Sequence, residues 1–436
     1  MPSLNPTRSL PAAFIVLLTA LSPAARGQVF LGGGGLVQPI GGAPGVIIDT
    51  DGYVHSRQAD DADTLTTARQ QRPKPSADAI DKKEKFAYVS LPKLFADVKA
   101  RVDAGKDVPD ELRYLGGITQ LRYVFVYPDE KDLIIAGPAE PWAVNGQTAT
   151  GKRTGRPVLQ LDDLVVALRT AHAHDGQLFG CGIYPDVKSL EKAHDIATRM
   201  AGRPRKERKA ALEAALGPQE VRVFGTATDT RLAAICVAAD YELKRLALGM
   251  DTLPSIPIGN AVDNSRSAAN KFWFKAAYDP LLVARDGNAY EIRGSRLAIE
   301  SGMFDFDPRG ATEKAKAFAD KFTKQMPAVA AAAPLVAELQ NIADLSLLSH
   351  LIRRDRLAEK AGWPGLPWVL DANGCPVAKV PSPRTAQTLV NFTNGSMVAG
   401  GVSMAVGPYV TNESRQTDDK QTLDEPRKLA DAARRR

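Results

Sequence analysis

The pattern of apolar and polar positions separates strand-like stretches from helix-like ones along the chain. Residues 123–142, YVFVYPDEKDLIIAGPAEPW, contain two runs of aromatic and aliphatic side chains separated by the polar stretch PDEKD. Aromatic and β-branched runs favour strands, and a proline among carboxylates favours a turn. The stretch therefore predicts a β-hairpin with its tip at residues 128–132. Tyr123, Phe125 and Tyr127 are expected on one face of the sheet, and the valines between them on the other.

Downstream of residue 159, helix-like and strand-like stretches alternate. The helix-like stretches are LQLDDLVVALRTAHA, DVKSLEKAHDIATRM and TDTRLAAICVAADYELKRLALGM, and the strand-like stretches are LFGCGIYP and QEVRVFG. This alternation predicts an α/β layer with at least some parallel pairing of strands. Beyond the proline-rich TLPSIPIG, the stretches FWFKAAY, LLVARDGNAYEIRG and SRLAIES predict a β-meander, which forms either a separate β subdomain or an extension of the sheet.

The remaining stretches complete a mixed α+β chain with an α/β central domain. The leader contains VIIDTDGYVH, which predicts a small hairpin because Asp51-Gly52 is a turn pair. The end of the chain is charged and free of aromatic residues, as disordered tails are. The predicted segments are a signal peptide (1–27), a glycine-rich and polar leader (28–85), an α/β domain (86–255), a β-meander (256–310), a helical region (311–362), short C-terminal strands (363–410) and a disordered charged tail (411–436).

The first 27 residues have the order of an export signal. Arg8 precedes the apolar run LPAAFIVLLTAL, which is too short to span a bilayer as a helix. Ala25 and Gly27 supply small side chains before a cleavage site at Gln28. The sequence therefore predicts a secreted or periplasmic protein, with an uncleaved membrane anchor as the alternative. No later stretch is apolar and long enough to cross a bilayer, so no transmembrane segment is expected after signal removal.

The net charge does not point to a nucleic-acid partner. The formal charge is +6, and cleavage at Gln28 would remove Arg8 and Arg26 and leave +4. Basic residues gather in RPRKERKA (203–210), but no aromatic residue stands among them to stack on bases. The run is expected to be the solvated face of a helix.

The three cysteines, Cys181, Cys236 and Cys375, are too few for a disulfide framework, and their spacing lacks CxxC pairs. Cys181 lies in the apolar strand FGCGI with no cysteine-protease signature around it, so a buried structural thiol is expected. Whether two of the three form a disulfide stays open at this point.

Several blocks in the same order carry a resemblance to a known family. They are ELRYLGGITQLRYVFVYPDEKDLIIAGPAEPW, FGCGIYP, VAADYELKRLALGM, FWFKAAYDPLLVARDGNAYEIRG and FADKFTKQMPAVAAAAPLVAELQNIADLSLLSHLI. Over about residues 85–410 the chain resembles an uncharacterised bacterial family of exported proteins, a domain of unknown function. That family has serine and aspartate in its strand motif where Gly182 and Tyr184 stand here. The resemblance implies export and a shared domain, but no catalytic residue.

Two groups of polar residues are candidates for chemistry. His172 and His174, with Asp175 adjacent, form an H-x-H pair that is either a metal site or a polar helix end. Asp305 and Asp307 are either an acid/base pair or parts of a turn and strand. Because neither group has a third partner at recognisable spacing, we predict no catalytic residue, no metal and no cofactor.

Other motifs are absent or incomplete. The glycine cluster LGGGG is not followed by GKS or GKT, so it is not a phosphate-binding loop. GxSxG is absent, and Ser403 stands in a strand-like stretch rather than in a nucleophile elbow. Asn391, Asn394 and Asn412 each begin an N-x-S/T triplet, which matters only in a host that glycosylates them.

These observations favour an exported protein used for binding or assembly in the periplasm or cell envelope, with an envelope or extracellular partner. The four tryptophans stand beside turns or strand starts, where their rings can cap a core or face that partner. The alternative is a secreted hydrolase whose site is assembled from dispersed Asp and His residues.

Overall fold

The computed structural model describes residues 46–48, 54–56, 85–145, 148–173, 178–261, 270–303, 306–390 and 398–435. The predicted signal peptide, with its cleavage site between Gly27 and Gln28, lies outside these residues. In the leader, β1 (Val46–Ile48) and β2 (Val54–Ser56) pair antiparallel, which confirms the predicted hairpin.

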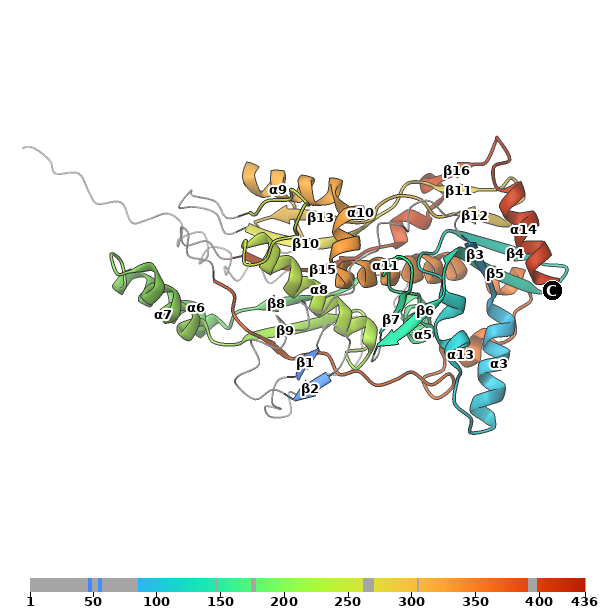
Figure 1. Cartoon of the computed structure of the whole chain (residues 1–436), viewed down its shortest axis with the longest axis horizontal. Coiled ribbons are helices and arrows are strands. Elements are labelled where there is room, and N and C mark those ends of the chain that lie inside the picture. The colour runs from blue at the N-terminus through green and yellow to red at the C-terminus, as the bar shows by residue number, and fades with distance from the viewer. Residues whose placement is uncertain are drawn as a thin grey trace, which may run out of the picture.

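Two six-stranded sheets form the frame of the protein, and the predicted mixed α+β class is confirmed. In spatial order, sheet I consists of β13 (Arg296–Gly302), β10 (Asn270–Ala277), β15 (Val398–Met404), β8 (Phe179–Tyr184), β9 (Gln219–Phe224) and β14 (Thr385–Ala386). Sheet II consists of β16 (Arg415–Thr417), β11 (Leu281–Val283), β12 (Ala289–Glu291), β4 (Tyr123–Tyr127), β5 (Asp132–Ala139) and β3 (Lys85–Ser90). Figure 1 shows the two sheets at opposite ends of the molecule.

The helices fill the space between the sheets and cover their faces. The longer helices are α3 (Leu91–Asp103), α5 (Leu161–Ala173), α6 (Val187–Arg199), α7 (Arg205–Leu216), α8 (Arg231–Ala247), α9 (Glu313–Lys324), α11 (Pro334–Arg354) and α14 (Asp424–Arg434). The shorter ones are α4 (Asp110–Arg113), α10 (Met326–Ala332), α12 (Leu357–Lys360), α13 (Leu366–Leu370) and the 3-10 turns η3 (Leu115–Gly117), η4 (Gly407–Val410) and η5 (Asn412–Ser414). A separate hairpin joins β6 (Trp142–Asn145) to β7 (Thr148–Gly151).

Helix α11 is the central element, and Figure 1 shows it in the middle of the molecule. Nearly all of its side chains from Val336 to Ile352 are buried, polar ones included. Near its middle, Asp344 accepts hydrogen bonds from Tyr278 and from Arg296 of β13. At its end, Asp355 accepts from Tyr290 of β12. One helix therefore ties sheet I to sheet II.

The hairpin β4–β5 is confirmed, with its turn at residues 128–131. Tyr123, Phe125 and Tyr127 pack together on the outer face of sheet II. Val124 and Val126 point the other way, into the main core. This is the alternation that a strand of period two requires.

The expected parallel pairing is not found between β8 and β9, which are antiparallel neighbours. Parallel pairs occur instead between β10 and β15 and between β11 and β16. A parallel crossover needs a helix packed on the sheet face, but α6 and α7 pack against each other and return the chain to the end of the sheet that it left. The predicted meander is likewise divided, because β10 and β13 extend sheet I whereas β11 and β12 extend sheet II.

The prediction of a disordered tail over residues 411–436 is wrong, because β16 and α14 lie there. Leu423 and Ala430 are buried against the aromatic outer face of sheet II. The tail has no aromatic residue of its own, but its apolar and arginine side chains meet aromatic residues supplied by β4.

Candidate functional site

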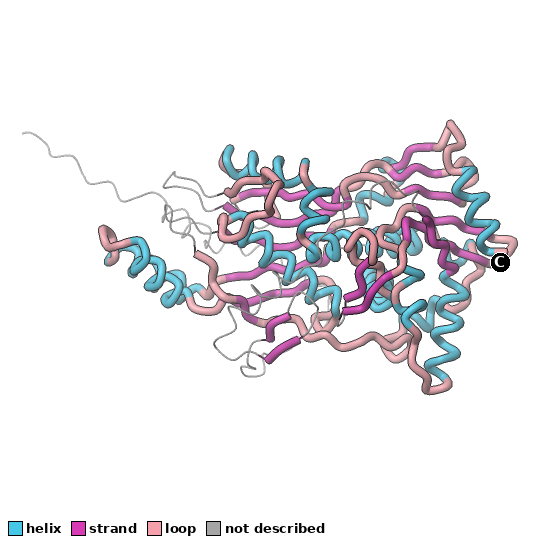
Figure 2. The backbone as a smooth tube through the Cα atoms, viewed as in Figure 1, coloured by secondary structure: helices cyan, strands magenta, loops and turns pink. Residues whose placement is uncertain are grey.

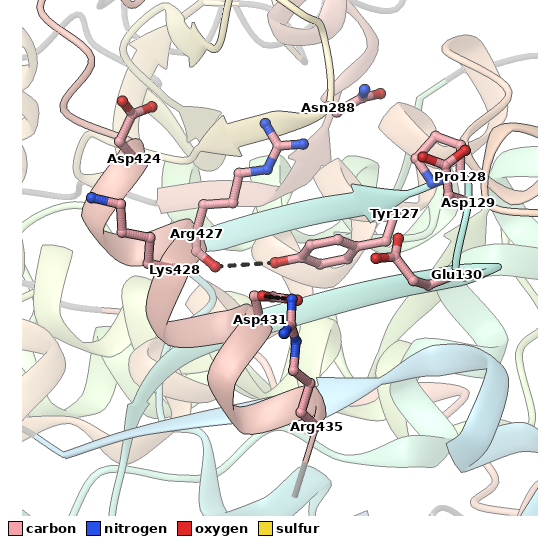
Figure 3. A pocket seen from close by; sticks show the side chains of 10 residues that line it. All are labelled: Tyr127, Pro128, Asp129, Glu130, Asn288, Asp424, Arg427, Lys428, Asp431 and Arg435. Atoms are coloured by element: carbon pink, nitrogen blue, oxygen red, sulfur yellow. Dashed lines mark hydrogen bonds and ion pairs between the residues drawn. The ribbon is translucent and has the colours of Figure 1, made fainter.

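A surface depression lies where α14 meets the tip of the β4–β5 hairpin, and Figure 3 shows it from close by. Its volume is about 530 Å³. The hairpin, the turn before β12 and helix α14 each contribute to its wall. The lining residues are Tyr127, Pro128, Asp129, Glu130, Asn288, Asp424, Arg427, Lys428, Asp431 and Arg435.

Tyr127 is the aromatic residue of this depression and is held by the two arginines of α14 that contact its ring. The guanidinium carbons of Arg427 and Arg434 lie 5.9 and 5.0 Å from the ring centroid, within the range of cation–π contacts. The Tyr127 hydroxyl donates to the carbonyl oxygen of Arg427 at 3.1 Å. Burial raises the pKa of Tyr127 to about 12, so the hydroxyl stays protonated and serves as a donor.

Most charges around the depression are already paired. Arg427 donates to Asp286, and Arg434 bridges Glu130 and Asp431 at 3.1 and 2.9 Å. Figure 3 shows Glu130, Arg427 and Asp431 at separate places around the depression.

One cluster of buried titratable groups is a structural network of ion pairs. Arg231 of α8 bridges Asp163 of α5 and Glu338 of α11, and all three side chains are buried. Two carboxylates share one guanidinium, so the group holds one excess negative charge. Burial, opposed by Arg231, raises the pKa of Asp163 to about 6. The trio joins the three helices that cross the core.

Of the predicted candidates for chemistry, the structure describes His172 and Asp307, each of which is bound by a partner in its own segment. His172 lies on α5, where its Nδ1 atom donates to the Leu168 carbonyl oxygen at 2.8 Å and burial lowers its pKa. Asp307 is bound in a bidentate ion pair by Arg309. His174, Asp175 and Asp305 lie outside the described residues. Across the ranges that the structure describes, no three His, Cys, Asp or Glu side chains are grouped to hold a metal ion.

The cysteines are structural. Cys181, Cys236 and Cys375 are all buried and free, which confirms the expected buried thiol at Cys181 and leaves no disulfide among them. Burial raises the pKa of the Cys181 thiol well above its ordinary value and that of Cys375 to about 12. A thiol held protonated in this way is a poor nucleophile.

The other residues singled out in the sequence serve local structure. Ser403 is in β15, paired with Gly180 of β8. Asn412 accepts a hydrogen bond from Arg354, whereas Asn391 and Asn394 lie outside the described residues. Among the tryptophans, Trp273 and Trp363 are buried and Trp142 and Trp368 are half-buried, so their rings cap the core.

Gly182 and Tyr184, the strand positions singled out by the resemblance, depend on each other. A Cβ atom at Gly182 would lie 2.5 Å from the Tyr184 hydroxyl oxygen, so the tyrosine ring occupies the space that a side chain at residue 182 would need. Arg222 of β9 lies over the same ring at 5.1 Å. Packing on the outer face of sheet I explains this pair of residues.

A helical arm, residues 185–218, projects from sheet I between β8 and β9. Figures 1 and 2 show α6 and α7 side by side, extending beyond the ends of the strands. Ala193 of α6 and Leu212 and Leu216 of α7 form a small core of their own, which Val390 joins at the base. Most other side chains of the arm are exposed or half-buried. The sequence predicts the two helices but not their projection from the sheet. The feature that could have indicated this projection is the scarcity of large apolar residues on α6 and α7.

Comparison with known proteins finds a family model that matches a part of the chain containing this arm. Residues 181–260 match DUF1598, a protein family of unknown function. The matched segment runs from β8 through the arm to β9 and α8. No curated protein and no solved structure matches the chain. In the described ranges, none of the helices combines the length and hydrophobicity that are needed to cross a membrane.

Proposed function

We propose that this is an exported protein of the periplasm or cell envelope that acts in binding or assembly, with the α6–α7 arm as its contact element. The observation that carries the proposal is the arm itself. Two helices leave the sheet, pack mainly on each other and bury little else, so the fold of the body does not require them. Exposed helices of this kind offer a contact surface to a partner.

The body of the protein supports the proposal as a rigid base. Helix α11 is anchored to both sheets, and the buried carboxylates of α5 and α11 are paired with Arg231. Polar networks of this kind fix one arrangement of a core. The arm is therefore presented at a fixed place, at the joined ends of β8 and β9.

The register of β8 and β9 provides a direct test. Tyr184 pairs with Glu220, so residues 185–219 are an insertion between two paired antiparallel strands. Replacing them with Asn-Gly gives a two-residue hairpin of a favoured type. We expect this armless variant to fold and to melt within a few degrees of the full chain, because both sheets and the main core remain.

Cosedimentation with isolated cell envelopes then measures the function. The full chain is expected to sediment with the envelopes, and the armless variant is expected to stay in the supernatant. Equal sedimentation of the two proteins would contradict the role of the arm. Mass spectrometry of the exported protein tests the predicted cleavage of the signal peptide. The expected result is a mature chain that begins at Gln28.

The hydrolase alternative has its own test. A hydrolase screen of the mature chain that found turnover, lost in Asp307→Asn or His174→Ala with folding intact, would establish an enzyme and overturn the proposal. The bidentate Asp307–Arg309 pair favours binding, because it holds the Asp307 carboxylate ionised and engaged by a neighbouring side chain.

A further inference from the structure

The tip of the arm holds the densest positive charge in this part of the chain. Residues 187–216 contain eight Lys or Arg and four Asp or Glu, a net charge of +4, compared with +6 for the whole sequence. Within residues 199–209, six are basic and one is acidic. The charge is therefore concentrated where α6 ends and α7 begins.

Several of these cations are available to a partner. Arg203, Arg205 and Lys206 are exposed, and none of them forms an ion pair within the described ranges. By contrast, Lys209 lies farther along α7 and faces Glu213 at 3.6 Å. Arg203, Arg205 and Lys206 thus form a set of exposed positive charges, unpaired within the described ranges, at the end of a projecting element.

The shape of the tip favours a flat anionic surface over a nucleic acid. The arm projects from the body as a convex element. Its end can therefore contact a flat surface that the body of the protein does not touch. Residues 187–216 contain no aromatic side chain to stack on bases. Clusters of Lys and Arg on a helix are a recognised means of binding anionic phospholipid headgroups.

We propose that the arm docks on an anionic phospholipid bilayer through Arg203, Arg205 and Lys206. This inference rests on the proposed function and names the partner of the arm. The contact is electrostatic and peripheral, because residues 199–209 contain one large apolar side chain, Met200, which is half-buried. Salt at about 0.5 M should therefore release the protein from the bilayer.

The test uses phosphatidylcholine vesicles with and without 30% phosphatidylglycerol. We expect the full chain to bind the anionic vesicles at low salt and to ignore the neutral ones. The variant R203Q/R205Q/K206Q should bind about 100-fold more weakly, since each cation near an anionic surface is worth roughly fivefold in binding. The control K321Q/K324Q/K420Q removes the same charge from exposed positions elsewhere and should bind as the full chain does.

The outcomes separate this inference from the proposed function. If the arm is required for binding to whole envelopes but lipid vesicles bind nothing, the partner is a protein or a polysaccharide and the bilayer inference is wrong, whereas the proposed function stands. If the tip variant and the control lost equal amounts of vesicle binding, the effect would come from net charge alone. That result would also overturn the bilayer inference. Tighter binding to a 20-base-pair DNA duplex than to anionic vesicles at the same salt would replace the bilayer with a nucleic acid.

Discussion

Tyr127 donates its hydroxyl hydrogen to the backbone carbonyl oxygen of Arg427, 300 residues later in the chain. The bond joins the last residue of β4 to the middle of α14. The C-terminal helix is thereby fixed over the aromatic outer face of sheet II, and it completes both that face and the depression beside it. Residues with the composition of a loose tail are an integral part of the fold.

Removing residues 424–436 should expose that face. Tyr127 and Phe125 lose their cover, and exposing one large apolar side chain costs about 1.5–3 kcal/mol of unfolding free energy. We expect binding of the dye ANS and a lower midpoint in urea. The substitution Leu429→Gln is the control, because Leu429 is 59% exposed and should change neither measurement. A truncated chain as stable as the full one would show that α14 contributes nothing.

The β4–β5 hairpin should tolerate change at its tip but not in its strands. Phe125→Ala removes a fully buried ring and should cost about 3–5 kcal/mol of unfolding free energy. Glu130→Ala removes only a partly exposed ion pair with Arg434 and should cost less than about 1 kcal/mol. Urea melts of the two variants measure the difference, and equal costs would contradict the assignment of face and tip.

The buried trio of Asp163, Arg231 and Glu338 should give the protein a specific pH dependence. The pKa of Asp163 is about 6 in the folded protein and 3.8 as its reference value. The folded state therefore binds the proton more tightly, and its stability rises as pH falls from about 6 to about 4, by up to about 3 kcal/mol. Above pH 6 this gain is absent.

Urea melts between pH 4 and pH 7 test this dependence by comparing Asp163→Asn with the unmodified chain. In the variant, the unfolding free energy should lack the rise between about pH 6 and about pH 4 that Asp163 causes, whatever the variant's absolute stability. Asp307→Asn is the matched control, because Arg309 lowers the pKa of Asp307 to about 2 and that group stays ionised over the whole window. If unfolding free energy depended on pH equally in the Asp163→Asn variant and the unmodified chain, a group other than Asp163 would bind the extra proton of the folded state.

Gly182 and Tyr184 should show coupled effects. Gly182→Ser alone places a Cβ atom where the Tyr184 ring lies, so the ring must move and its contact with Arg222 is lost, at a cost of about 1 kcal/mol. In Gly182→Ser/Tyr184→Asp the obstacle is absent, and the double variant should be more stable than the sum of the single changes implies. Additive costs in the double-mutant cycle would show that the two sites are independent.

Local pattern predicted the elements well where side chains alternate between two distinct faces. The alternation in residues 123–127 assigned both faces of β4, because a strand with apolar residues on both sides must separate them by parity. The apolar surroundings of Cys181 likewise indicated a buried thiol. These results follow from the side chains of one segment and need no knowledge of its neighbours.

Tertiary partners were less predictable. The direction of β9 relative to β8 depends on whether α6 and α7 pack on the sheet, which neither strand encodes. The order of the tail depends on Tyr127 and Phe125, almost 300 residues away. The arm and the depression are formed by segments that meet only in space, so neither has a linear motif.

The position of β15 within sheet I has a consequence for the order in which the chain acquires its structure. This strand, Val398–Met404, stands between β10 and β8 and is their sole connection in the sheet. Until the ribosome has made residue 404, no strand joins β10 to β8 by hydrogen bonds, and their facing edges are unpaired. Completion of sheet I is therefore delayed until residue 404 has been synthesised. If the chain is exported as we propose, a nascent chain held open for so long would suit a translocation channel that accepts only unfolded polypeptides.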